Sequence, residues 1–148
     1  MTIKILQNGD PEWTDVISFA ENCSWKAGPF LARAMKDERF SEWERVIAAF
    51  EGTEPVGFCS LTEYDFTEPE DPGIKPFIGF VFVREDCRGG RLSQRMTEAA
   101  EKYAHGLGYQ EVYLTSGEEG LYEKYGYSAA GEKMTGHGVT ETLFRKDI

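Results

Sequence analysis

Hydrophobic and polar positions change their spacing along the chain, and these changes predict alternating strands and helices. Residues 1–7 have the short apolar pattern of a first strand. Residues 10–25 open with Asp-Pro, a common start of a helix, and residues 27–40 carry apolar positions three and four residues apart, as a second helix does. Residues 42–66 divide into two strands around the Gly-Thr-Glu-Pro turn at residues 52–55, which predicts a β-hairpin.

The second half of the chain alternates in the same way. Residues 77–83 are an apolar run short enough for a buried central strand, and residues 92–107 place their apolar side chains on one helical face. A strand at residues 110–116, a short helix within residues 117–126 and a final strand at residues 139–146 follow. This mixed order predicts an α+β fold (α/β in its one strand–helix–strand unit), in which a mixed β-sheet is flanked by helices.

Length and composition favour one globular domain over residues 1–148. The chain is long enough to bury a core of its own, and its hydrophobic fraction of 41% is that of a packed protein. Its formal net charge of −10 argues against non-specific binding to nucleic acid or to an anionic membrane, because both need a basic face. An acidic surface either serves solubility or favours cationic small molecules.

The sequence shows no sign of a membrane span, a secretory signal or a metal site. No apolar run approaches the roughly 20 residues that cross a bilayer, and the N-terminus lacks a sustained apolar stretch after a basic start. Cys23, Cys59 and Cys87 are widely spaced and form no CxxC pair, and only two histidines are present, so no metal is expected. Such cysteines favour reduced thiols in a cytoplasmic protein.

A basic turn, REDCRGGRLSQRM at residues 84–96, separates the central strand from the long helix. The start of a helix exposes unpaired N–H groups and the positive end of the helix dipole, which attract anions. Gly89 and Gly90 allow a positive φ and close approach of a ligand, while Arg88 and Arg91 add forked cationic donors suited to phosphate oxygens. The residues alone leave two interpretations open: a phosphate cradle, or a plain turn with solvent-facing arginines.

The same segment resembles motif A of the GNAT superfamily of acyl-CoA N-acyltransferases, in which an apolar strand precedes R/Q-x-x-G-x-G/A and a long helix. Residues 88–93 occupy these six positions. Arg91 stands where the family usually has glycine, and Ser93 where it has glycine or alanine, although backbone N–H donors survive a change of side chain. GLYEKYGY at residues 120–127 resembles motif B, and the two motifs in this order extend the resemblance over essentially the whole chain.

The resemblance implies a GNAT fold whose central strand and its neighbour splay apart and hold acetyl-CoA as a cosubstrate. Backbone groups of Phe82 and Val83 would hold the pantetheine arm. The pyrophosphate would be held by amides of the turn, which belong to Arg88, Gly89, Gly90, Arg91, Leu92 and Ser93. The implied reaction is direct attack of an amine on the thioester through a tetrahedral intermediate.

The reaction needs an acid and a base, and the sequence offers candidates for both. Tyr122 matches the family's general acid, which protonates the leaving thiolate, and a phenol with an ordinary pKa of about 10 is protonated at neutral pH. A packed aromatic on a short helix is the alternative for Tyr122, and Tyr125 is expected in the core because the family usually has an apolar residue there. For the base, the carboxylates that flank the central strands stay open, and any of them can act through water: Glu63, Asp65, Glu85 and Asp86. Asp65 is the first choice because it ends the strand before the acidic loop, and a solvated loop carboxylate is the alternative for each.

The acceptor is expected to be a small cationic amine. TEYDFTEPEDPG at residues 62–73 carries five carboxylates and no basic residue, and in this fold it lies near the acceptor side of the cleft. Trp25 and Phe30 are candidates for an aromatic wall, with a place in the core as the alternative. A non-catalytic acyl-CoA-binding or regulatory domain stays open as a function, as does an O-acyl or protein N-terminal acyltransferase. Homodimers are common in the family, so a homodimer also stays open.

Overall fold

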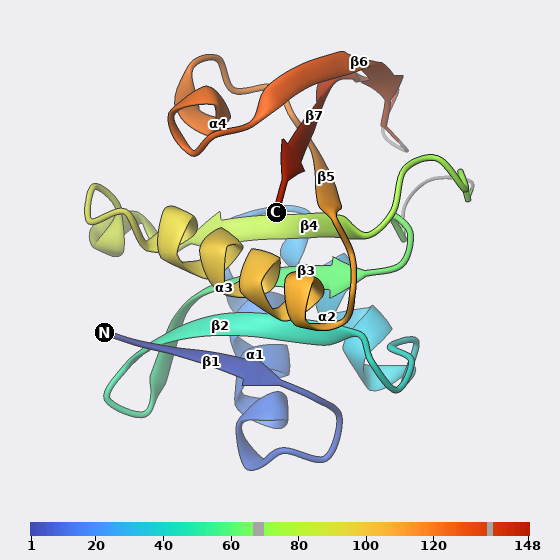
Figure 1. The fold of residues 1–148 in the computed structure, drawn as a ribbon. Helices are drawn as coiled ribbons and strands as arrows, with labels where there is room; N and C mark the ends of the chain where they lie inside the picture. Colours follow the sequence, from blue (N-terminus) through green and yellow to red (C-terminus); the bar gives the residue numbers. More distant parts are fainter. Residues whose placement is uncertain (67–69, 136–137) are drawn as a thin grey trace.

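A computed structural model describes residues 1–66, 70–135 and 138–148, and within them the backbone forms one mixed sheet of seven strands (Figure 1). The strands are β1 (Thr2–Leu6), β2 (Arg45–Glu51), β3 (Glu54–Thr62), β4 (Phe77–Val83), β5 (Glu111–Ser116), β6 (Ser128–Met134) and β7 (Thr140–Asp147). Their order across the sheet is β1-β2-β3-β4-β5-β7-β6. Neighbouring strands are antiparallel except β4 and β5, which are parallel.

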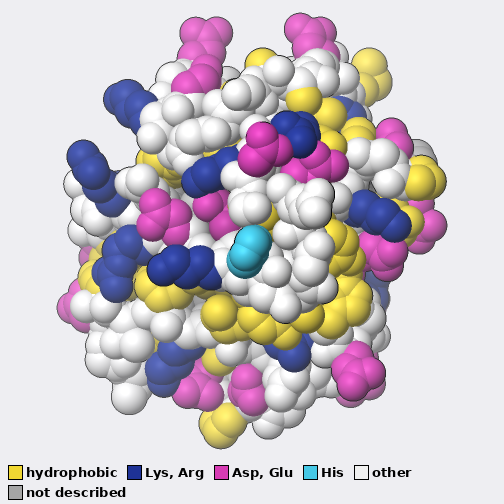
Figure 2. Space-filling model, viewed as in Figure 1, with side chains coloured by type: hydrophobic (Ala, Val, Ile, Leu, Met, Phe, Trp, Pro, Cys, Tyr) yellow, Lys and Arg dark blue, Asp and Glu magenta, His cyan; other side chains and the backbone are white. Residues whose placement is uncertain are grey.

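The helices lie on both faces of this sheet. They are α1 (Pro11–Asn22), α2 (Gly28–Lys36), α3 (Leu92–Gly106) and the short α4 (Leu121–Lys124), with a 3₁₀ turn at Glu85–Cys87. In Figure 1, α3 crosses the near face of β2 to β4, while α1 and α2 lie behind the sheet. The near face mixes acidic and basic side chains, with Lys and Arg frequent on the left, where α3 begins (Figure 2). The predicted α+β class, a mixed sheet flanked by helices, is confirmed.

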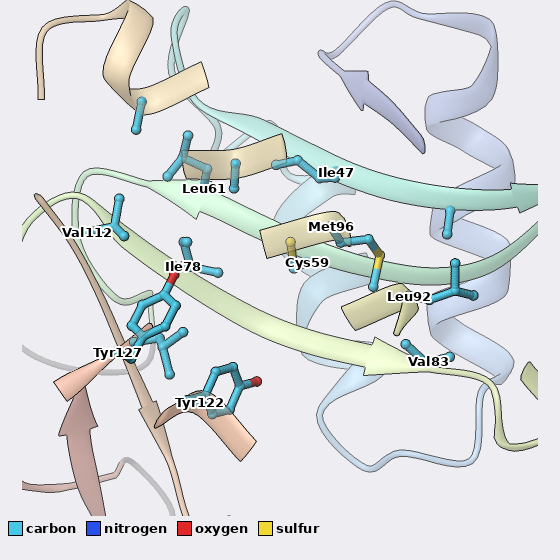
Figure 3. Close-up of a cluster of buried hydrophobic side chains, with 14 of the residues drawn as sticks. Ile47, Cys59, Leu61, Ile78, Val83, Leu92, Met96, Val112, Tyr122 and Tyr127 are labelled. Carbon is cyan, nitrogen blue, oxygen red and sulfur yellow. The ribbon is translucent and has the colours of Figure 1, made fainter. Parts of the chain in front are cut away.

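The pleat of the strands divides the core into two apolar clusters. In β2, Ile47 faces the cluster that contains Met96 of α3, and Figure 3 shows these side chains on the same side of the sheet. The neighbouring Val46 faces the other cluster, which holds Val16 of α1 and Leu31 of α2. Successive side chains of a strand point to opposite faces, so the apolar run of β2 is buried on both.

The parallel pair β4–β5 is joined over a short length only. Its register, within the described residues, consists of Phe77 opposite Tyr113, near the start of both strands. On its other edge β4 pairs with β3 from Phe77 to Val83, with a bulge near Phe80, whose φ is +52°. Beyond Phe77 the edge of β4 that faces β5 is therefore left without a strand partner, as the predicted splay requires.

One strand has no recognisable signal in the sequence. β6 was not predicted, and residues 128–134 are almost entirely exposed at the edge of the sheet, beside β7. An edge strand with no buried face has no alternation of apolar and polar residues, so it gives no strand signal. The predicted strands at residues 77–83 and 110–116 and the helix starting at residue 92 all form, within one or two residues of their expected bounds.

Two further properties concern the described residues alone. None of their helices is both long and apolar enough to span a bilayer. They also contain no group of three or more His, Cys, Asp or Glu side chains arranged to hold a metal ion.

Candidate active site

A cleft of about 750 Å³ opens where β4 and β5 part. β4 forms its floor from Phe77 to Val83, and the turn after β4 closes one end. The opposite wall comes from the end of β5 and from α4, with β7 behind them. Of the ten predicted site residues, nine line this cleft: Asp65, Phe82, Val83, Arg88, Gly89, Arg91, Leu92, Ser93 and Tyr122. Gly90 belongs to the same turn but is not among the lining residues.

The turn presents a run of backbone N–H groups to the cleft. In the part of the chain that the structure describes, none of the backbone amides of residues 89–94 donates a hydrogen bond. Gly89 has φ +90°, and Arg91, which immediately precedes the 15-residue α3, has φ +61°. Consecutive free amides at the positive end of a helix dipole form an anion-binding concavity. The left-handed φ of Arg91 also explains why glycine is usual at this position in the family.

Arg88 packs across the end of β4. Its Nε donates to the Val83 carbonyl oxygen at 2.8 Å, its guanidinium carbon lies 5.5 Å from the centre of the Phe82 ring, and its terminal nitrogen is 3.9 Å from a carboxylate oxygen of Glu85. The side chain is 55% exposed, so its remaining donors reach solvent at the cleft mouth. With Arg91 it makes this end of the cleft basic within an acidic protein.

The two residues predicted to hold pantetheine face different ways. The Val83 carbonyl points away from β3, since it accepts from Arg88, while the next amide, that of Arg84, donates to the Val56 carbonyl of β3 at 2.8 Å. The Phe82 carbonyl points toward β3, because its oxygen would lie 3.0 Å from a Cβ placed on Gly57. Phe82 thus contributes its ring to the cleft, not its carbonyl.

Tyr122 stands on α4 in the opposite wall. It is 5% exposed, and its ring packs against Tyr125, Tyr127 and Phe144 with centres 5.6 to 5.9 Å apart. Figure 3 shows its hydroxyl pointing away from Tyr127 and toward the side of Val83. Burial, reinforced by the charge of Glu118, raises the pKa of this phenol above its ordinary value. The hydroxyl is therefore a proton donor over the whole neutral range.

Three carboxylates also line the cleft. Asp65 was predicted, and it follows β3 as expected. Glu118, between β5 and α4, and Glu141, on β7, were not predicted. Both charges contribute to the raised pKa of Tyr122, after the larger effect of its burial. No local pattern marks either residue: Glu118 lies in the loop between β5 and α4, and Glu141 becomes part of the site only when β7 pairs beside β5. The cleft is thus lined by both arginines and carboxylates.

The predicted aromatic wall is present in part. Trp25 lines the cleft and stacks on Phe82 with ring centres 5.9 Å apart and planes 4° apart. Phe30 is 56% exposed and is not among the lining residues. Within the predicted acidic stretch, Glu68 lies outside the described residues.

Sequence and structure comparisons assign the family. Residues 11–127 match the Acetyltransferase (GNAT) family. The chain belongs to this family. No curated protein sequence matches the chain.

Solved GNAT-type acetyltransferases share the fold over nearly the whole chain. An aminoglycoside 6'-acetyltransferase type Ii has a TM-score of 0.75 and 18% identity, covering 99% of this chain and 97% of its own. An aminoglycoside 6'-N-acetyltransferase complexed with coenzyme A has a TM-score of 0.72 and 16% identity, with the same coverage. The PaiA N-acetyltransferase of Thermoplasma acidophilum, in complex with coenzyme A, has a TM-score of 0.65, 14% identity and full coverage of both chains. At these identities the likeness concerns the fold.

Proposed function

We propose that this GNAT protein is an N-acetyltransferase that moves the acetyl group of acetyl-CoA to a small cationic amine. The observation that carries the proposal is the run of free amides at residues 89–94, flanked by Arg88 and Arg91, at the mouth of a cleft that contains Tyr122. Two similar acetyltransferases were solved with coenzyme A, and two act on aminoglycosides by their descriptions. The coenzyme A complexes support an acyl-CoA donor, and the aminoglycoside acetyltransferases support an amine acceptor.

The cleft fits the chemical parts of acetyl-CoA. The pyrophosphate matches the free amides and the guanidinium groups of Arg88 and Arg91, because both kinds of donor favour an anion. The pantetheine arm matches the unpaired edge of β4 beyond Phe77, where an extended polar chain can bond to the backbone as an added strand does. Bound acetyl-CoA would supply an activated thioester in the water-poor part of the cleft.

Tyr122 and a carboxylate would move the protons. Tyr122 would donate its hydroxyl proton to the sulfur that leaves as the C–S bond breaks, and its raised pKa keeps that proton in place at neutral pH. The attacking nitrogen must lose a proton as the new C–N bond forms. Asp65, which lines the cleft, would accept this proton through water.

The carboxylates of the cleft select the acceptor in this proposal. Asp65, Glu118 and Glu141 line the same cleft as Tyr122. Carboxylates attract an ammonium group and repel an anionic acceptor, most strongly at low ionic strength. A molecule with at least two amino groups suits such a site, because one amine can stay charged and bind while another loses its proton and attacks.

The test is acetyl transfer measured as release of free coenzyme A thiol. The acceptors would be a diamine, a polyamine, an aminoglycoside and a neutral alcohol. We expect turnover with the cationic amines and a fall in kcat of about a hundredfold in Tyr122→Phe, the contribution of one general acid. Tyr103→Phe, which removes a hydroxyl from α3 outside the cleft lining, is the control.

Two outcomes would overturn the proposal. Binding of acetyl-CoA by calorimetry without turnover on any acceptor would favour a non-catalytic acyl-CoA-binding domain. Faster turnover of the neutral alcohol than of every amine would remove the assignment to cationic amines.

A further inference from the structure

One hydrogen bond crosses the cleft between its two walls. The Ser93 hydroxyl and the Tyr125 hydroxyl lie 2.8 Å apart, and both side chains line the cleft. Ser93 stands in the first turn of α3, which follows β4. Tyr125 directly follows α4, which comes after β5. The bond therefore joins the segment with the free amides to the segment with Tyr122.

This bond connects the two walls of the cleft at the end where β4 and β5 do not pair. Within the described residues, β4 and β5 share one register pair, Phe77 with Tyr113, near the start of both strands. Ser93 and Tyr125 meet beyond the opposite, carboxyl ends of the same strands. The sheet thus fixes the two walls at one end of the cleft, and the hydroxyl pair fixes them at the other.

Both partners are departures from the usual family pattern. Ser93 occupies a position at which glycine or alanine is usual, and Tyr125 one at which an apolar residue is usual. Neither usual residue carries a hydroxyl, so the usual pair makes no such bond. The two departures meet in one contact in this chain.

Tyr125 also packs against Tyr122. The two rings are in edge-to-face contact, with centres 5.6 Å apart and planes at 84°. The Tyr125 carbonyl accepts from Lys146 Nζ at 2.8 Å, and the same ammonium bonds Glu101 of α3 at 2.8 Å. The backbone of Tyr125 is thus anchored, and Ser93 fixes the far tip of its side chain.

We propose that Ser93 and Tyr125 act as a clasp that positions the Tyr122 phenol relative to the thioester of an acetyl-CoA whose pyrophosphate is held at the start of α3. This inference rests on the proposed function. Tyr125 is a positioning residue here, because its hydroxyl bonds Ser93 and not the reacting atoms. The clasp aligns the proton donor with the leaving sulfur, so its loss affects the chemical step more than coenzyme binding.

A double-mutant cycle tests the clasp. The variants are Tyr125→Phe, Ser93→Ala and the double variant, with Ser93→Thr as the conservative variant and Tyr103→Phe as the control. We expect each single change to lower kcat about tenfold, the size of one well-placed hydrogen bond, while KM for acetyl-CoA stays within about twofold. The double variant should be no slower than either single one, since both remove the same bond. Ser93→Thr, which retains a hydroxyl, should keep most of kcat.

Several results would overturn the clasp. They are an unchanged kcat in Tyr125→Phe, multiplicative losses in the double variant, or a loss confined to KM. Urea unfolding of the same variants shows whether a slow variant is simply less folded, and a fall in kcat that tracks the unfolded fraction also counts against the clasp. A wild-type protein without turnover overturns the proposed function and the clasp with it, whereas an active wild type with unchanged variants overturns the clasp alone.

Discussion

Arg88 Nε donates to the Val83 carbonyl oxygen at 2.8 Å, which ties the turn with the free amides to the last residue of β4. The planar guanidinium also lies over the Phe82 ring, 5.5 Å from its centre. A lysine side chain can supply the charge of Arg88, but not the fork that bonds a carbonyl with one nitrogen and leaves two others for phosphate.

Replacement of Arg88 should weaken acetyl-CoA binding, by an amount that depends on the new residue. Arg88→Ala is expected to raise Kd about tenfold, because one charged hydrogen-bond donor to phosphate is lost. Arg88→Lys should fall between Ala and wild type. Isothermal titration calorimetry measures both, with Arg95→Ala, an exposed arginine of α3 outside the cleft lining, as the control. Equal Kd values for Arg88→Ala and Arg95→Ala would remove Arg88 from the coenzyme site.

Replacement of Arg91 should change both the stability of the fold and the affinity for acetyl-CoA. A φ of +61° destabilises a residue with a Cβ by about 1–2 kcal/mol. Glycine avoids this strain, but its greater freedom in the unfolded chain cancels part of the gain in stability. Arg91→Gly is therefore expected to raise the free energy of unfolding by about 0.5 kcal/mol and to raise Kd for acetyl-CoA about threefold.

Arg91→Gln separates the two effects of Arg91. It removes the charge and keeps the strained φ, so it should show the same loss of affinity without the gain in stability. Urea unfolding and calorimetry give the two quantities. A more stable Arg91→Gln, or a less stable Arg91→Gly, would contradict this account of the turn.

The carboxylates Glu118 and Glu141 of the cleft should act on the acceptor alone. Glu118→Gln and Glu141→Gln are each expected to raise KM for a diamine about threefold and to leave KM for acetyl-CoA unchanged. The wild-type KM for the diamine should also rise with ionic strength, because salt screens these charges. Glu132→Gln, on the exposed edge strand β6, is the control. An equal effect in all three variants would point to net charge instead of a specific site.

The pH profile should lack a falling limb from Tyr122. Burial raises the pKa of its phenol above the ordinary value of about 10, so the proton needed for the leaving sulfur is retained as the pH rises. The value of kcat/KM should therefore increase with pH as the acceptor amine loses its proton, and then level off. Tyr122→Phe should lower the plateau and leave the rising limb in place. A falling limb below about pH 9 that is absent from Tyr122→Phe would contradict this role.

A buried ionic network should stabilise the wall that carries α4. Glu101 accepts from the Tyr127 hydroxyl at 2.7 Å and from Lys146 Nζ at 2.8 Å, and its side chain is 8% exposed. Glu101→Ala leaves both donors without this acceptor, so we expect a loss of about 3 kcal/mol in the free energy of unfolding. Tyr127→Phe should cost about 1 kcal/mol. Urea unfolding measures both, with Glu98→Ala on the exposed side of α3 as the control.

The sequence by itself determined the elements that have a buried face, but not the exposed strand β6, and it determined the residues whose role is local. The apolar run of β4, the glycines and arginines of the turn and the periodic face of α3 are contiguous, so their pattern predicts a buried strand, free amides and a helix start. Tyr122 was predicted differently, from the resemblance of a short local motif, residues 120–127, to motif B of the family.

Tertiary structure alone decided which distant residues meet. Pairing of β7 beside β5 brings Glu141 to the cleft, and the parting of β4 from β5 creates the space itself. The bond between Ser93 and Tyr125 joins residues that sequence analysis treated separately, one as part of the cradle and one as core. The physical reason is that a local pattern reports the period of the backbone and the burial of each face. Contacts between separate elements depend on how the whole sheet is assembled.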